Sequence, residues 1–221
     1  MEPEPASGTL IFLFTDVEGS TRLWERLPQA MKAALERHDR ILQAAVAASN
    51  GQVVKTTGDG IMATFPSAAA AVRACLAAQR DLAAEPWGAT GALQVRMGLH
   101  AGEAATRSSD YFGPTVNRAA RIMAVGHGGQ VLLSSAAAAL VTDRLPDAAG
   151  LRDLGVHRLK DLGRPERLFS CSTPTSPTAS RRWPRLTVAP TTFPPRPRPS
   201  SDGTRNWRRS VDASRTRRCG C

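Results

Sequence analysis

Residues 51–65 read GQVVKTTGDGIMATF, and the pattern in this stretch decides the fold class. Runs of β-branched and other apolar residues flank the tetrapeptide TGDG at 57–60. An Asp-Gly step between two such runs is a strong hairpin signal, because glycine adopts the backbone angles that a tight turn requires. We therefore predict two antiparallel strands joined at residues 57–60.

The segment before the hairpin predicts a buried strand and then a long helix. Residues 9–14 (TLIFLF) are almost continuously apolar, which is typical of a strand covered on both faces. From Arg22 to Ala48, apolar residues recur at steps of three or four over much of the stretch, the spacing of one helix face. Pro28 starts the main helix or bends it, and the turn residues at 50–51 end it.

The segment after the hairpin completes a βαββαβ order. Ser67 caps an Ala-rich helix that runs to about Ala84, and residues 93–104 alternate as a strand. Across 9–104 this order is the split βαβ arrangement, so we predict an α+β fold with a ferredoxin-like βαββαβ core. Additional C-terminal strands and helices are expected as follows: a helix from Pro114 to Gly126, a strand at 129–135, a short helix capped by Ser135, and strand-like segments at 151–159 and 166–171.

The formal net charge of +10 belongs to the C-terminal end of the sequence. Residues 171–221 hold 11 Arg and two Asp, whereas residues 1–170 hold 18 basic and 17 acidic side chains. The nearly neutral part predicts no specific nucleic-acid partner. The last 51 residues are rich in Pro, Ser and Arg without a helical or strand period, which predicts a disordered tail. We divide the chain into an N-terminal extension (1–7), a globular domain (8–170) and this tail.

Two carboxylates occupy positions where they contribute little to stability. Asp16 directly follows the first strand, and Asp59 lies in the hairpin turn. The split βαβ order places that strand and the hairpin side by side, so the two side chains could meet at adjacent strand ends. Paired carboxylates repel unless a cation holds them, and Mg²⁺ with substrate phosphates suits such ligands. The simpler interpretation is a helix cap for Asp16 and an ordinary turn residue for Asp59.

Three segments of the chain carry a resemblance to a known family. FTDVEGST at 14–21, VVKTTGDG at 53–60 and DYFGPTVNRAAR at 110–121 resemble the signature segments of class III adenylate and guanylate cyclases. The resemblance covers roughly residues 8–170 and is strongest to the bacterial branch whose first motif reads TDVEGSTRLWE. It implies two domains paired head to tail as a homodimer, with each active site drawing on both subunits.

The resemblance also implies a reaction and a set of roles. ATP would be converted to 3′,5′-cyclic AMP and pyrophosphate, with two Mg²⁺ or Mn²⁺ ions per active site held by Asp16 and Asp59. One ion would generate the ribose 3′ nucleophile and the other would neutralise the phosphates. Asn117 would orient the ribose and Arg121 would stabilise charge on the α-phosphate. Both stand on one face of a predicted helix and would come from the partner subunit.

Lys55 and Asp110 match the positions that read the base in the resembling family. Asp110 would accept from the adenine amino group and Lys55 would donate to the ring nitrogen, a pattern that guanine does not match. For Asp110, a neighbouring Ser could take the aligned position instead. Lys160 resembles a triphosphate-binding lysine.

Two alternative functions stay open, namely a guanylate cyclase and a catalytically degenerate cyclase-homology domain used in regulation or dimerisation. The presence of all the matched residues favours an enzyme. Early apolar runs are too short for a membrane span and the start lacks a secretory pattern, so we expect a cytoplasmic protein without a membrane partner. The sequence also leaves open a regulatory domain or partner that is not in this chain. The tail is either a genuine extension or a frameshift or truncation product.

Overall fold

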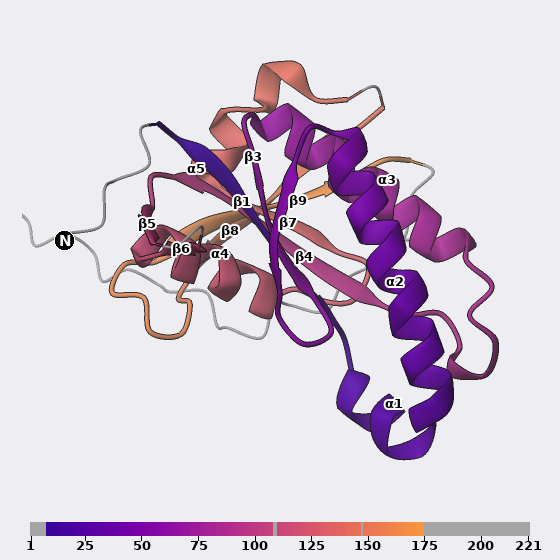
Figure 1. Cartoon of the computed structure of the whole chain (residues 1–221). Coiled ribbons are helices and arrows are strands. Elements are labelled where there is room, and N and C mark those ends of the chain that lie inside the picture. Colours follow the sequence, from indigo (N-terminus) through magenta and orange to yellow (C-terminus); the bar gives the residue numbers. More distant parts are fainter. Residues whose placement is uncertain (1–7, 108–109, 147, 175–221) are drawn as a thin grey trace, which may run out of the picture. The chain divides into compact units, whose positions relative to one another are not determined.

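The computed structural model describes residues 8–107, 110–146 and 148–174. The expected N-terminal extension and the expected tail from residue 175 onward lie outside the described residues. A mixed sheet of seven strands carries the fold, in the order β2-β3-β1-β4-β7-β9-β8 (Figure 1). The strands of this sheet are β1 (Leu10–Val17), β2 (Gln52–Thr56), β3 (Ile61–Phe65), β4 (Val95–Gly102), β7 (Val131–Ser134), β8 (Gly150–His157) and β9 (Glu166–Ser172).

The first four strands confirm the predicted ferredoxin-like core. β1 lies between β3 and β4 and is antiparallel to both, with Phe14 opposite Met62 on one side and Gly98 on the other. The predicted hairpin is formed by β2 and β3. β7 then adds to β4 in parallel, and β9 and β8 extend the sheet in antiparallel pairs.

Helices cover the sheet on both faces (Figure 1). On one face lie α2 (Pro28–Ala48), α3 (Ala68–Ala84) and α5 (Ser135–Ala139), and on the other lies α4 (Pro114–Ala124). In β1, Ile11 and Leu13 belong to the core under α2 and α3, whereas Phe12 and Phe14 pack with residues of α4. Because successive side chains point to opposite faces, both sets must be apolar, which explains the nearly continuous apolar run.

The long helix predicted from Arg22 to Ala48 is two helices. α1 (Ser20–Arg26) ends before Leu27, whose φ of −142° and ψ of 56° are not helical, and α2 starts at Pro28. Proline disfavours helical backbone angles in the residue before it but suits the first helical position, so the break falls at Leu27. Of the two expectations for Pro28, that it starts the main helix or that it bends it, the first is confirmed.

Three further details differ from the sequence-based expectation. Ser67 caps α3 as predicted, but α5 is capped by Ser134, whose hydroxyl accepts from Ala137 N at 3.1 Å, and not by Ser135. A small hairpin of β5 (Ala105–Arg107) and β6 (Asp110–Phe112) was not predicted. β9 continues to Ser172, and Cys171 within it is buried, so the first residues of the expected tail belong to the sheet. No helix within the described ranges is long and apolar enough to cross a membrane.

Candidate active site

A close backbone contact places Asp59 beside Asp16. The turn is closed by Thr57 N, which donates to Gly60 O at 2.8 Å, and Ile61 N donates to Thr15 Oγ1 at 2.9 Å. A Cβ atom on Gly60 would lie only 1.9 Å from the Thr15 carbonyl oxygen, so only glycine allows this approach. The hairpin turn is therefore held against the end of β1, and the two carboxylates meet there. We call Asp16 and Asp59 the metal pair.

The electrostatics of Asp16 reflect this crowding. Burial raises the pKa of Asp16 above its ordinary value, the Arg96 guanidinium offsets part of the rise, and the Asp59 carboxylate adds to it. Arg96 donates to Asp16 Oδ2 from Nε at 2.8 Å and from Nη2 at 2.5 Å. Arg96 also donates to the carbonyl oxygen of Ala124, at the end of α4. This arginine therefore offsets part of the negative charge of the metal pair.

Sequence reasoning missed Arg96. It stands directly opposite Asp16 in the β1–β4 register, so the two side chains are cross-strand neighbours. The signal that could have found it was the split βαβ order, which also brings a fourth strand, expected at residues 93–104, next to the first strand. A charged residue opposite the end of a strand that carries a candidate metal ligand is a candidate partner for that ligand.

The metal pair fits a divalent cation. Asp59 Oδ2 is buried and has no hydrogen-bond partner among the described residues, which is costly for a carboxylate oxygen unless a cation occupies the position. No group of three or more His, Cys, Asp or Glu side chains that could hold a metal occurs within 8–107, 110–146 and 148–174. Two carboxylates alone suit Mg²⁺, which keeps waters and substrate phosphates in its shell.

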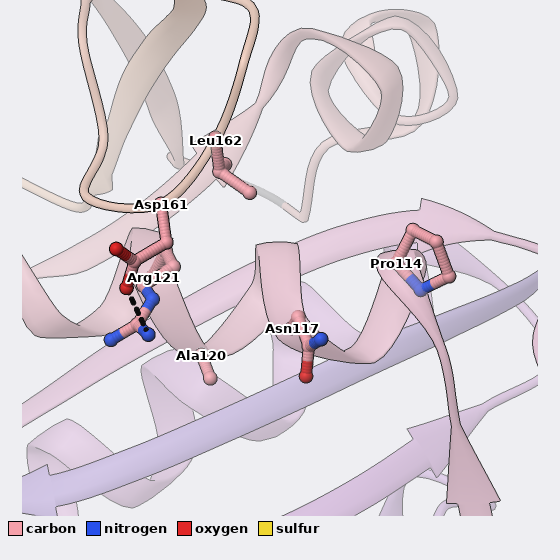
Figure 2. Close-up of a pocket in the computed structure, with 6 residues that line it drawn as sticks. All are labelled: Pro114, Asn117, Ala120, Arg121, Asp161 and Leu162. Carbon is pink, nitrogen blue, oxygen red and sulfur yellow. Dashed lines mark hydrogen bonds and ion pairs between the residues drawn. The ribbon is translucent and has the colours of Figure 1, made fainter.

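A second set of polar side chains lies on α4. Val116, Ala119 and Ile122 face the core, which leaves Asn117 and Arg121 on the outer side of the helix. Both line a pocket of about 430 Å³, together with Pro114, Ala120, Asp161 and Leu162 (Figure 2). Arg121 Nη2 donates to Asp161 Oδ2 at 2.7 Å. The predicted pair is therefore brought together at one pocket, and neither member of the metal pair is among the residues that line it.

Lys55 and Asp110 are also brought together, from strands 55 residues apart in the sequence. Lys55 Nζ donates to Asp110 Oδ2 at 2.5 Å, and Tyr111 N donates to Asp110 Oδ1 at 2.8 Å. Lys55 and the Tyr111 N–H hold the pKa of Asp110 below its ordinary value. The Tyr111 ring packs edge-on against Phe12, at 5.4 Å between ring centroids, and this contact anchors β6 to the sheet.

Lys160 is exposed on the connection between β8 and β9, next to Asp161. It is not among the residues that line the pocket of Asn117 and Arg121, although its neighbours Asp161 and Leu162 are. We call Lys55, Asp110, Asn117 and Arg121 the nucleotide group. The pairs Lys55–Asp110 and Asn117–Arg121 are each assembled in the structure.

Comparison with known proteins identifies the family of this fold and site. The model of the adenylate and guanylate cyclase catalytic domain matches residues 3–152. The chain belongs to this family. Among solved cyclases it is similar to adenylate cyclases from Trypanosoma brucei in their monomeric state, with a TM-score of 0.73 and 25% identity over 85% of this chain and 97% of that one.

Two curated relatives of this chain are longer than the chain itself. An uncharacterized protein of Mycobacterium tuberculosis is 40% identical over 172 residues, which is 77% of this chain and 58% of that protein. The adenylate cyclase of Neurospora crassa is 38% identical over 159 residues, covering 61% of this chain and 7% of that protein. The chain thus spans little more than half of the first relative and a small part of the second.

Proposed function

We propose that this cyclase domain is an adenylate cyclase that converts ATP to 3′,5′-cyclic AMP and pyrophosphate. The observation that carries the proposal is the metal pair, in which Asp16 and Asp59 meet and one buried Asp59 oxygen has no partner among the described residues. A structural role would not need two neighbouring carboxylates of this kind, because their repulsion opposes folding. A divalent cation held by Asp16 and Asp59 would remove that repulsion.

Asp16 and Asp59 would hold two Mg²⁺ or Mn²⁺ ions. Such ions, when bound, lower the pKa of the ribose 3′-hydroxyl and neutralise charge on the triphosphate and the leaving pyrophosphate. The protein's own task is then to fix the position of the nucleotide. Ring closure is a phosphoryl transfer, in which positioning and charge stabilisation supply most of the catalysis.

Lys55 and Asp110 support adenine as the base. A carboxylate can accept from the adenine amino group, and an ammonium group can donate to the neighbouring ring nitrogen. Lys55 donates to Asp110 at 2.5 Å, so the fold brings both side chains to one spot. Guanine presents an acceptor and a donor at the same positions, so either side chain would face a group of its own kind.

Asn117 and Arg121 would contact the ribose and the α-phosphate, and Lys160 would contact the triphosphate. The planar guanidinium of Arg121 offers several donors to phosphate oxygens whose charge changes during transfer. The pocket of Asn117 and Arg121 does not include the metal pair among its lining residues. This separation supports a head-to-tail homodimer, in which the metal pair of one subunit faces the nucleotide group of its partner.

Product identification tests the proposal directly. The purified chain is incubated with ATP or GTP and Mn²⁺, and the products are separated by chromatography and identified by mass spectrometry. We expect cyclic AMP from ATP, and none from an Asp59→Ala variant treated in the same way. Cyclic GMP in equal or greater yield would contradict the assignment of the base. Absence of any cyclic nucleotide would contradict the enzyme and favour a regulatory role.

A further inference from the structure

Three basic side chains of the site are each paired with a carboxylate of the same chain. Lys55 pairs with Asp110, Arg96 with Asp16, and Arg121 with Asp161 (Figure 2 shows the last pair). In the first two pairs the carboxylate has a proposed role of its own: Asp110 would contact the base and Asp16 would hold a metal ion. Asp161 has no such role, so its function must be sought in what it does to Arg121.

The position of Asp161 is set by the core and not by chance contact. Leu159 is buried with Ile122 of α4, and Leu162 packs at the border of the same cluster. Between them, Leu162 N donates to Leu159 O at 3.3 Å and closes the turn. Asp161 takes a φ of 62°, a left-handed conformation that few residues other than Gly, Asn and Asp adopt readily. This anchored turn presents the Asp161 carboxylate to α4.

The guanidinium of Arg121 can bind a carboxylate or a phosphate with the same donors. Its planar fork matches the two oxygens of either group, and both ligands are anionic. Asp161 lines the same pocket as Asn117 and Arg121, so the carboxylate lies where an anionic group of a bound nucleotide would approach Arg121. Carboxylate and phosphate cannot use the same N–H donor at the same time.

We propose that Asp161 is an internal competitor of the nucleotide phosphate: the Asp161 carboxylate pairs with Arg121 and is displaced when nucleotide binds. This inference rests on the proposed function, since it takes Arg121 as the phosphate-binding arginine. Asp161 acts through Arg121 and is a positioning residue, not a catalytic one. By holding the guanidinium over the pocket, it keeps Arg121 in a single location while limiting how tightly substrate binds.

The exposure of the pair makes such an exchange feasible. The side chains of Arg121 and Asp161 are 40% and 59% exposed, so water and salt screen their attraction. An exposed ion pair shifts an equilibrium by up to about fivefold. Nucleotide affinity should therefore rise by about two- to fivefold when the carboxylate is neutralised. A buried pair would be far harder to exchange.

The first test needs no nucleotide. The full chain and its Asp161→Asn variant are treated with phenylglyoxal, which modifies accessible arginines, and modification of Arg121 is followed by peptide mass spectrometry. Asn tolerates the left-handed φ and keeps the shape of Asp, so the turn should survive. We expect Arg121 to react about two- to fivefold faster in the variant. Equal rates would show that Asp161 does not hold Arg121 and would overturn the proposal.

Asp153→Asn is the matched control. Asp153 is a surface carboxylate of β8, 45% exposed, and lies 3.6 Å from Arg167 outside the pocket. Its neutralisation removes one negative charge from a neighbouring part of the same fold. Arg121 reactivity should stay at the wild-type rate in this control. If the modification rate of Arg121 rose as much in this control as in Asp161→Asn, the change in net charge alone would explain the effect, and the proposal would also be overturned.

The second test measures competition without turnover. Binding of α,β-methylene-ATP, which cannot release pyrophosphate, is measured with Mn²⁺ by calorimetry, and KM and kcat for ATP are measured separately. We expect the analogue to bind about two- to fivefold tighter to Asp161→Asn, with a matching fall in KM and little change in kcat. A fall in kcat at constant affinity would mean that Asp161 orients Arg121 for the chemical step and does not compete. Tighter analogue binding without any cyclic product would uphold the competition while the proposed cyclase activity failed.

Discussion

The metal pair and the nucleotide group are held in place by different means. Asp16 and Asp59 sit at the end of a central strand, where a glycine contact with Thr15 brings two backbones together. The nucleotide group sits on an edge strand, a short hairpin and the outer side of α4, and its charged members are exposed and held in ion pairs. Backbone packing thus preforms the metal pair despite its repulsion. The nucleotide group stays adjustable because weak, exposed ion pairs hold it.

The largest expected effect separates the chemistry of the metal pair from its contribution to stability. Asp59→Ala should lower kcat by several orders of magnitude, on the order of 10³-fold or more, because a proposed metal ligand is lost. The melting temperature should stay unchanged or rise, since a buried carboxylate oxygen without a partner is removed. Initial rates and thermal unfolding measure the two properties.

Asp81→Ala is the control for Asp59→Ala, because Asp81 is an exposed carboxylate at the C-terminal end of α3. Its activity should equal that of the wild type. Near-normal activity in the Asp59 variant would contradict the metal assignment. Loss of folding in that variant would show instead that the hairpin turn needs the charge.

The second prediction tests whether the two halves of the site come from different subunits. Asp16→Ala and Arg121→Ala, each inactive alone, should regain activity when mixed. In a mixed dimer both lesions fall in one site and the other site is intact. With random pairing about half the dimers are mixed, so about a quarter of wild-type activity is expected. Rates of the mixture, with dimer formation confirmed by sedimentation, measure this.

The matched control for that mixture combines Asp16→Ala with Asp59→Ala. Both lesions then lie in the metal pair, so no intact site can form and activity should stay at background. Rescue in this control as well, or no rescue in the first mixture, would mean that the halves are not divided between subunits as proposed.

A smaller effect concerns the base. Exchanging Lys55 for Glu and Asp110 for Cys should erode the preference for ATP over GTP by about tenfold or more, because the hydrogen-bond pattern then suits guanine. The ratio of kcat/KM for the two nucleotides measures it. Asn117 is unchanged in this double variant, so residual turnover reports on an intact ribose contact. An unaltered ratio would assign base selection to other residues.

The smallest effect is the response of the two halves to pH. The pKa of Asp16 is raised and that of Asp110 is lowered, so on acidification Asp16 takes up a proton first. A proton on Asp16 competes with a cation, so Mn²⁺ binding should be weaker at pH 5 than at pH 7. Calorimetric titration at the two pH values measures this. Asp110→Asn should leave the pH profile of Mn²⁺ binding unchanged, whereas a pH-independent affinity in the wild type would contradict a proton on Asp16.

Local pattern was sufficient for much of the fold, whereas the resemblance to cyclase motifs supplied the candidate members of both halves of the site. An Asp-Gly step between β-branched runs favours a hairpin through its backbone angles, and the apolar run at 9–14 is typical of a strand covered on both faces. The spacing of Asn117 and Arg121 puts both on one face of any helix. These inferences depend on neighbours within a few residues, which is why they could be made from the sequence.

Only the tertiary structure decided which charged side chains pair across the sheet and between the loops and α4. Arg96 contacts Asp16 because of the β1–β4 register, and Asp161 contacts Arg121 because the Leu159–Leu162 turn is anchored against α4. Residues 80 and 40 positions apart are joined in these pairs, and no local period encodes such separations. By charge alone, many carboxylates of the chain could pair with each arginine. Packing of the apolar core selects one of them, because it fixes which backbones come within reach.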